Sequence, residues 1–166
     1  LLQHLPGIEP AARPEAARRA LARGAGALDA AAQADIVAET LALLEDPGFA
    51  PLFGPDSLAE VPVTGLIDGA VVSGQVDRLV VADDAVLVVD YKTGRRAPGS
   101  VDQVPPAYLR QMALYRALLA RAFPGRRIKA GLVFTAGPRL VALPDAALDE
   151  AFSALTAQLD GGGPPP

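Results

Sequence analysis

The sequence predicts an α/β fold, a mixed β-sheet flanked by helices, and two observations favour it. Residues 58–92 are rich in valine and hold turn residues between apolar runs, which is typical of a strand meander. Segments with helical spacing of apolar residues lie before and after this region, and further strands follow the long helix. A helix between two stretches of strand predicts a crossover that brings the later strands into the same sheet.

Two helices are expected first. Residues 14–23 carry a proline in the first turn, where its missing N–H is tolerated. Asp29 can cap a second helix that runs to about Asp46, and Pro47 and Gly48 end it.

The meander predicts three strands, at residues 58–64, 69–82 and 85–92. Asp83 and Asp84 supply a tight turn between the second and third strands, which predicts an antiparallel hairpin. Pro105 and Pro106 open a long helix that runs to about Phe123. Two strands and a last helix complete the prediction, at residues 128–135, 139–142 and 146–159.

The 166 residues suit one domain, placed at residues 1–160, with GGGPPP at 161–166 as a flexible tail. The first residues lack a methionine, a basic region and a cleavage site. We therefore expect a cytoplasmic piece of a longer protein, with its N-terminal helix truncated. No apolar run approaches the roughly 18 residues of a membrane span. The absence of cysteine excludes disulfides, zinc–thiolate sites and iron–sulfur clusters.

Charge is unevenly distributed along the chain. The net charge of −4 argues weakly against nucleic-acid binding. The segment from Lys92 to Lys129, however, holds nine basic residues and one acid, Asp102. These cations can also be the solvated face of a helix, so the asymmetry is supporting information only.

The stretch VLVVDYKTG places polar residues at the end of an apolar strand. Because side chains alternate along a strand, Asp90 and Lys92 share one face and Tyr91 points to the other. Asp77 and Asp90 lie six residues before and six residues after the hairpin turn. The hairpin is therefore expected to bring these two acids close together.

Two interpretations of these residues stay open. Asp90 and Lys92 can form a surface ion pair, worth at most about 1 kcal/mol. Alternatively, Asp77 and Asp90 bind a divalent cation that relieves the repulsion between two neighbouring carboxylates on a mostly buried sheet. Oxygen ligands suit Mg²⁺ or Mn²⁺, and Lys92 beside them could orient or deprotonate a water for phosphodiester hydrolysis.

Gln111 and Tyr115 stand at i and i+4 on one face of the long helix. Either they are ordinary residues of an amphipathic helix, or they face the strand end, where the glutamine bonds to the lysine, to water or to DNA.

Three stretches in this order, GQVDRLVV, VLVVDYKTG and QMALYRALL, resemble the nuclease domain of the RecB family, within the D…(D/E)-x-K restriction-endonuclease-like superfamily. The Q-x-x-x-Y helix after D-Y-K-T is the distinguishing mark of that family. LLQHLPG, AEVPVTG, SGQVDR and VFTAGPRL are most similar to the C-terminal nuclease domains of AddA-type helicase–nuclease subunits.

This resemblance implies a Mg²⁺-dependent DNA exonuclease within a bacterial ATP-dependent helicase–nuclease that processes double-strand breaks for recombinational repair. The implied partners are single-stranded DNA from unwound duplex, an AddB-type subunit and the protein's own N-terminal helicase region, which alone would bind ATP. The implied site residues are Asp77 and Asp90 as metal ligands, the Tyr91 backbone carbonyl as a further ligand, Lys92 as the catalytic lysine, and Gln111 and Tyr115 around them.

One departure concerns a histidine. The family places a histidine metal ligand on an N-terminal helix, whereas the only histidine here is His4, with Pro6 two residues later. We expect that ligand upstream of Leu1, and His4 to be structural or exposed. A catalytically incomplete module that binds DNA or a partner subunit is therefore the alternative function. Glu60, on the first strand, is expected at a solvated edge, with a supporting role behind the site as the alternative.

Overall fold

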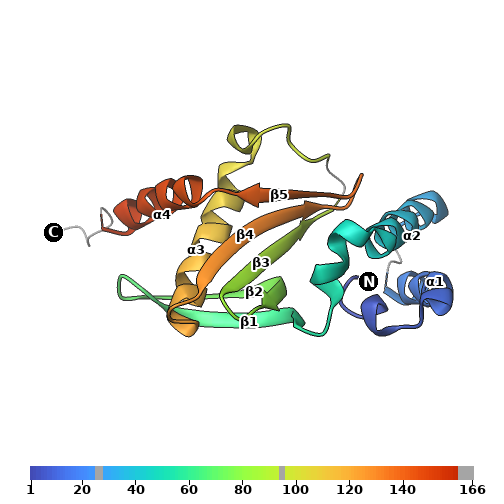
Figure 1. Ribbon diagram of the computed structural model, residues 1–166. Coiled ribbons are helices and arrows are strands. Elements are labelled where there is room, and N and C mark those ends of the chain that lie inside the picture. Colours follow the sequence, from blue (N-terminus) through green and yellow to red (C-terminus); the bar gives the residue numbers. More distant parts are fainter. Residues whose placement is uncertain (25–27, 94–95, 161–166) are drawn as a thin grey trace.

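The computed structural model describes residues 1–24, 28–93 and 96–160, with backbone only for residues 158–160. The predicted tail at 161–166, and Gly94 and Arg95 after the third strand, lie outside the described residues. A five-stranded sheet in sequence order forms the centre of the fold (Figure 1). Its strands are β1 (Ser57–Ile67), β2 (Ala70–Val81), β3 (Ala85–Lys92), β4 (Arg127–Phe134) and β5 (Arg139–Leu143).

The sheet is mixed, as the sequence predicts. Strands β1, β2 and β3 form an antiparallel meander. Helix α3 (Pro106–Ala122) then crosses over, so that β4 lies parallel to β3, and β5 returns antiparallel to β4. The prediction of a meander, a crossover helix and further strands is confirmed.

The helices also agree with the sequence. The α-helices besides α3 are α1 (Arg13–Gly24), α2 (Ala30–Glu45) and α4 (Asp145–Asp160). Short 3₁₀ turns lie at Leu5–Gly7, Pro10–Ala12, Pro47–Phe53 and Val101–Gln103. Asp29 caps α2 by accepting a hydrogen bond from the Ala32 N–H at 2.7 Å, as expected. Among the described helices, none combines the length and the apolar character needed to cross a membrane.

Strand β1 is longer than predicted, because it continues past Gly65 to Ile67 before the hairpin turns at Asp68 and Gly69. A glycine usually weakens a strand interior. Here Gly65 pairs with Val72 in the ladder, and its missing side chain leaves room for a leucine of α3. The glycine therefore permits close packing instead of ending the strand.

Strand β3 is buried on both faces. Val86 and Val88 pack in the main core with α3, whereas Val89 packs on the opposite face with Leu43 of α2 and Phe49 of the 3₁₀ turn that follows it. Figure 1 shows α1 and α2 gathered at one end of the sheet and α3 lying across it. The carboxyl end of β3 thus lies between α3 on one side and the N-terminal segment on the other.

Candidate active site

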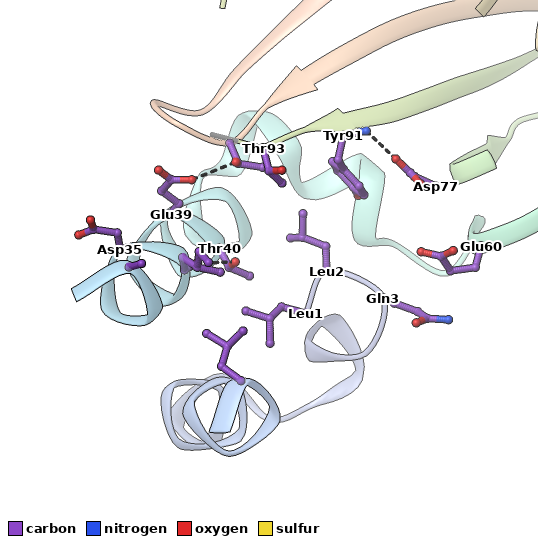
Figure 2. Close-up of a pocket in the computed structure, with 14 residues that line it drawn as sticks. Leu1, Leu2, Gln3, Asp35, Glu39, Thr40, Glu60, Asp77, Tyr91 and Thr93 are labelled. Carbon is purple, nitrogen blue, oxygen red and sulfur yellow. Dashed lines mark hydrogen bonds between the residues drawn. The ribbon is translucent and has the colours of Figure 1, made fainter. Parts of the chain in front are cut away.

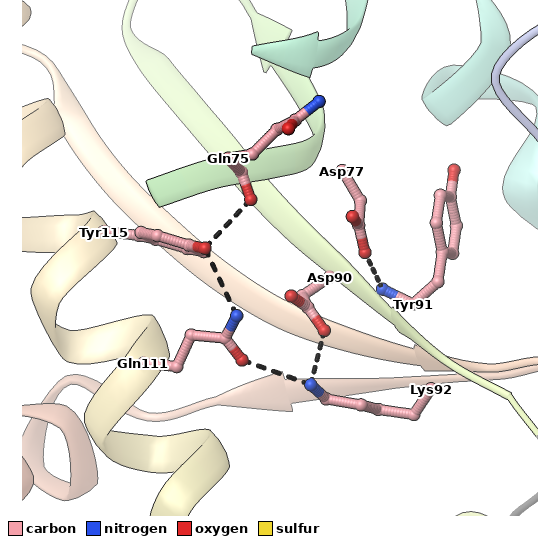
Figure 3. Close-up of polar contacts among 7 residues, drawn as sticks. All are labelled: Gln75, Asp77, Asp90, Tyr91, Lys92, Gln111 and Tyr115. Atoms are coloured by element: carbon pink, nitrogen blue, oxygen red, sulfur yellow. Dashed lines mark hydrogen bonds and ion pairs between the residues drawn. The ribbon is translucent and has the colours of Figure 1, made fainter. Parts of the chain in front are cut away.

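Asp90 and Lys92 project from the carboxyl end of β3 toward α3, on the face that Val86 and Val88 share (Figure 3). The Lys92 Nζ lies 2.6 Å from the Asp90 Oδ2, and the two side chains are 12% and 7% exposed. The predicted shared face is confirmed. The pair is buried, so the interpretation as a surface ion pair is wrong.

A chain of hydrogen bonds extends from Lys92 across α3 to strand β2 (Figure 3). The Lys92 Nζ donates to the Gln111 Oε1 at 3.2 Å, and the Gln111 Nε2 donates to the Tyr115 hydroxyl at 3.2 Å. That hydroxyl in turn donates to the backbone carbonyl of Gln75 at 2.9 Å. Gln111 and Tyr115 therefore do face the strand end, and the glutamine bonds to the lysine.

Tyr108 is a residue of the site that the sequence reasoning missed. The Lys92 Nζ lies 3.8 Å from the centroid of the Tyr108 ring, a cation–π contact. Tyr108 precedes Gln111 by three residues and Tyr115 by seven, so helical spacing alone could have placed it on the same face.

Asp77 lies where the ladder between β2 and β3 ends. The last pair is Arg78 with Val89, and Asp77 and Asp90 occupy the next position, as the hairpin count predicts. Beyond that pair, the Asp77 Oδ2 accepts the Tyr91 backbone N–H at 2.7 Å. Burial raises the pKa of Asp77 above its usual value, and the negative charges of Asp90 and Glu60 raise it further, against the lowering effect of the Tyr91 N–H and Lys92.

Glu60 lies on the edge strand β1 and is partly exposed, and its carboxylate also lines a cavity beside Asp77. The residue is half-buried, and its carboxylate accepts a hydrogen bond from the Gln75 Nε2 at 2.5 Å. Its φ of +54° interrupts the β1–β2 ladder opposite Asp77, between two regular residue pairs. Such a conformation is uncommon for a residue other than glycine, and here it accompanies a side chain directed into a cavity.

That cavity, of about 690 Å³, lies between the sheet and the N-terminal segment (Figure 2). Its acidic lining residues are Asp35, Glu39, Glu60 and Asp77. Of the described residues that line it, none is basic. The cavity wall therefore favours cations and repels a phosphate that has no counterion.

The donor set at the strand end fits a hard divalent cation. Asp77 and Asp90 supply carboxylates, and Tyr91 supplies a carbonyl that points to the same side of β3 as its N–H, toward Asp77. The described residues contain no group of three or more histidine, cysteine or acidic side chains placed to hold a metal. Two carboxylates and a carbonyl suit Mg²⁺ or Mn²⁺, because these ions keep several waters. His4 is exposed and does not line the cavity.

Arg78, which the sequence reasoning also missed, is 4% exposed and fixes the N-terminal segment to the sheet. Its Nη2 donates to the Leu2 carbonyl at 2.5 Å, and its Nε donates to the Tyr91 hydroxyl at 3.4 Å. The guanidinium also stacks over the Phe53 ring at 5.2 Å. Burial raises the pKa of the Tyr91 hydroxyl, and the hydrogen bond and charge of Arg78 oppose that rise.

Comparison with known proteins agrees with this geometry. The family model described as PD-(D/E)XK nuclease superfamily matches residues 3–160. The chain belongs to the PD-(D/E)XK nuclease superfamily. Its mixed sheet with flanking helices is the restriction-endonuclease-like α/β fold. PD-(D/E)XK nucleases are generally phosphodiester hydrolases and typically use divalent metals.

A solved structure shares this fold. A "putative exonuclease" from Eubacterium rectale matches 97% of this chain with a TM-score of 0.64 and 16% identity. The chain spans 66% of that protein's length, and at this identity the likeness concerns the fold alone. A second structure, that of SSO0001, matches 80% of this PD-(D/E)XK chain and 70% of its own, with 14% identity and a TM-score of 0.39. Among proteins of curated function, none matches the sequence.

Proposed function

We propose that this PD-(D/E)XK domain is a metal-dependent DNA exonuclease. The observation that carries the proposal is the strand end, where Asp77 and Asp90 lie just beyond the last ladder pair and Lys92 bonds to both Asp90 and Gln111. Asp77, Asp90 and the Tyr91 carbonyl would hold the cation. The bound cation supplies Lewis-acid activation of a water and of a phosphodiester oxygen.

Lys92 has three N–H donors, and the structure shows what directs two of them. Asp90 and Gln111 each accept one, and the Tyr108 ring lies against the ammonium group. A third donor can orient the attacking water or hold a phosphate oxygen. The positive charge of Lys92 stabilises the extra negative charge that develops on the phosphate as it is attacked.

We further propose that the domain works in a helicase–nuclease of the AddA type, in DNA double-strand break repair. The support is the similarity of LLQHLPG, AEVPVTG and VFTAGPRL to such subunits. In that setting the substrate is a single strand from unwound duplex, ATP serves the helicase region, and an AddB-type subunit is the partner. Co-purification of the full-length protein with an AddB-type subunit tests this assignment.

The nuclease assignment is tested by Mg²⁺-dependent release of nucleotides from single-stranded DNA. Asp90→Ala should abolish release, because it removes a ligand and the partner of Lys92. Asp102→Ala is the matched control, because Asp102 is an exposed acid in the neighbouring basic segment. Equal activity of Asp90→Ala and the unaltered protein would show that the strand end is not the active site.

A module that binds DNA or a partner subunit without cutting is the second candidate. It is favoured by the exposed position of His4, which leaves two carboxylates as the charged ligands at the described strand end. Calorimetric titration with Mn²⁺ separates the two candidates. No binding at millimolar concentrations supports the binding module, whereas binding that Asp77→Ala removes supports the nuclease.

A further inference from the structure

Strand β2 carries a glycine directly under the ring of Tyr115. A Cβ at Gly74 would lie 2.6 Å from the Tyr115 Cε1, 3.0 Å from its hydroxyl oxygen and 3.2 Å from its Cζ. We propose that Gly74 is a positioning residue. Because it has no side chain, the Tyr115 ring can lie against β2, where it orients the Gln111 amide and through that amide the Lys92 ammonium group. The inference rests on the proposed nuclease function.

The ring must pass over Gly74 to reach its hydrogen-bond partner. The Tyr115 hydroxyl donates to the carbonyl of Gln75, the residue that follows Gly74 on the strand. The ring is rigid and 8% exposed, so it cannot bend around an added methyl group as a flexible chain end could. A side chain at this position would lift the ring from the strand and break the bond to Gln75.

The Gln75 carbonyl determines which group donates and which accepts at each step of the hydrogen-bond chain. A carbonyl only accepts, so the Tyr115 hydroxyl gives its proton to that carbonyl and offers a lone pair to Gln111. The Gln111 amide must then present its Nε2 to the tyrosine and its Oε1 to Lys92. Without Tyr115 in place, the Gln111 amide can turn its NH₂ group toward the Lys92 ammonium group, which cannot accept a hydrogen bond.

Strand β1 offers a matched control. Gly65 also faces α3, and a Cβ there would lie 2.7 Å from the Leu118 Cδ2. The clash is similar and involves the same helix, but it falls on the end of an aliphatic side chain. Gly65→Ala therefore tests the packing cost without disturbing the polar chain.

The experiment is a double-mutant cycle on the rate of DNA cleavage. Gly74→Ala should lower kcat roughly ten- to a hundredfold, in keeping with overpacking of a closely packed site, with little change in KM. Gly65→Ala should lower it less than threefold. In a Tyr115→Ala background, Gly74→Ala should cost nothing more, because the ring it meets is gone. A wild-type kcat for Gly74→Ala, or an equal loss in both backgrounds, overturns the inference.

A second measurement separates this inference from the nuclease proposal. The chain has two lysines, Lys92 and the exposed Lys129, so side-chain NMR of labelled lysine gives a site signal and an internal reference. Gly74→Ala should shift the Lys92 signal and leave the Lys129 signal unchanged, whether or not the protein cuts DNA. An unshifted Lys92 signal overturns the positioning role, whereas a shift in a protein without nuclease activity overturns only the proposed function.

Loss of folding in the single variant would still leave a decisive comparison. If Gly74→Ala does not fold, Gly74→Ala combined with Tyr115→Ala should fold, because the double variant removes the clash. Tyr115→Phe, which keeps the ring and removes the hydroxyl, should shift the Lys92 signal. An unfolded double variant, or an unshifted Lys92 signal in Tyr115→Phe, counts against the inference.

Discussion

Replacing Lys92 by methionine removes a buried charge while keeping most of the stem that packs beside α3. The Lys92 and Asp90 side chains are 12% and 7% exposed, so the variant leaves a buried carboxylate without its partner. Loss of one member of such a pair costs about 3–5 kcal/mol. We expect the lower end, about 3 kcal/mol, because both side chains keep some contact with solvent and the pair is not fully desolvated. At 2–4 °C per kcal/mol for a chain of this size, Tm should fall by about 6–12 °C.

The assay is thermal unfolding in EDTA near neutral pH, followed by circular dichroism. Lys129→Met is the matched control, because Lys129 is the other lysine of the chain and is exposed on β4. An exposed substitution of this kind should cost no more than about 0.5 kcal/mol. If Lys92→Met melts within 2 °C of the unaltered protein, the charge pair is not buried as the structure places it, and the reasoning is refuted.

Thermal unfolding of the same variant with added metal tests whether a cation binds near Asp90. In Lys92→Met the Asp90 carboxylate lacks a cation, so Mg²⁺ or Ca²⁺ should raise Tm more in the variant than in the unaltered protein. Nucleotide release should be lost even at saturating metal. Equal metal-induced shifts in both proteins would show that the cation does not bind near Asp90.

Three further outcomes follow from the structure. Burial raises the pKa of Asp77, so protonation of this carboxyl stabilises the folded protein; the stabilisation is complete below pH 3.8 and is lost as pH rises through the raised pKa. Asp77→Asn mimics the protonated carboxyl. In EDTA at pH 7 it should therefore melt at a higher temperature than the unaltered protein, and this difference in Tm should vanish near pH 3.5. Arg78→Met should speed hydrogen exchange in residues 1–7, measured by mass spectrometry, because it removes the bond to the Leu2 carbonyl, at a cost of about 1–3 kcal/mol. Arg116→Ala should cost less than about 1 kcal/mol in urea unfolding, because its partner Asp149 is 67% exposed.

The parts of the site that the sequence predicted depend on residue spacing within one hairpin or one helix. Asp77 and Asp90 were placed together by equal distances from a turn, and the observed register, Arg78 with Val89, has the same sum of residue numbers. Gln111 and Tyr115 were placed together by helical spacing, which the hydrogen bond between them confirms. Neighbouring positions in a hairpin or helix leave little freedom, so sequence spacing determines them.

The parts that the sequence did not predict depend on contacts between distant segments. Arg78 meets a backbone carbonyl 76 residues away, and no local pattern indicates that partner. Glu60 lines the cavity with a φ of +54°, a conformation that its residue type disfavours and that strand alternation cannot anticipate. Tyr108 is the exception, since its spacing to Gln111 was visible in the sequence.

The site arises because β3 stays paired with β4 after its ladder with β2 has ended. Val89 pairs with both β2 and β4, whereas Tyr91 keeps its partner on β4 alone. The Tyr91 N–H therefore donates its hydrogen bond to the Asp77 carboxylate, a charged side chain, and not to the neutral backbone carbonyl of a neighbouring strand. That hydrogen bond satisfies the donor but places a desolvated carboxylate beside Asp90, at an electrostatic cost that the proposed cation would offset. The pleat of β3 points the Tyr91 carbonyl to the same side as its N–H, so the proposed cation would meet a backbone ligand where the ladder ends.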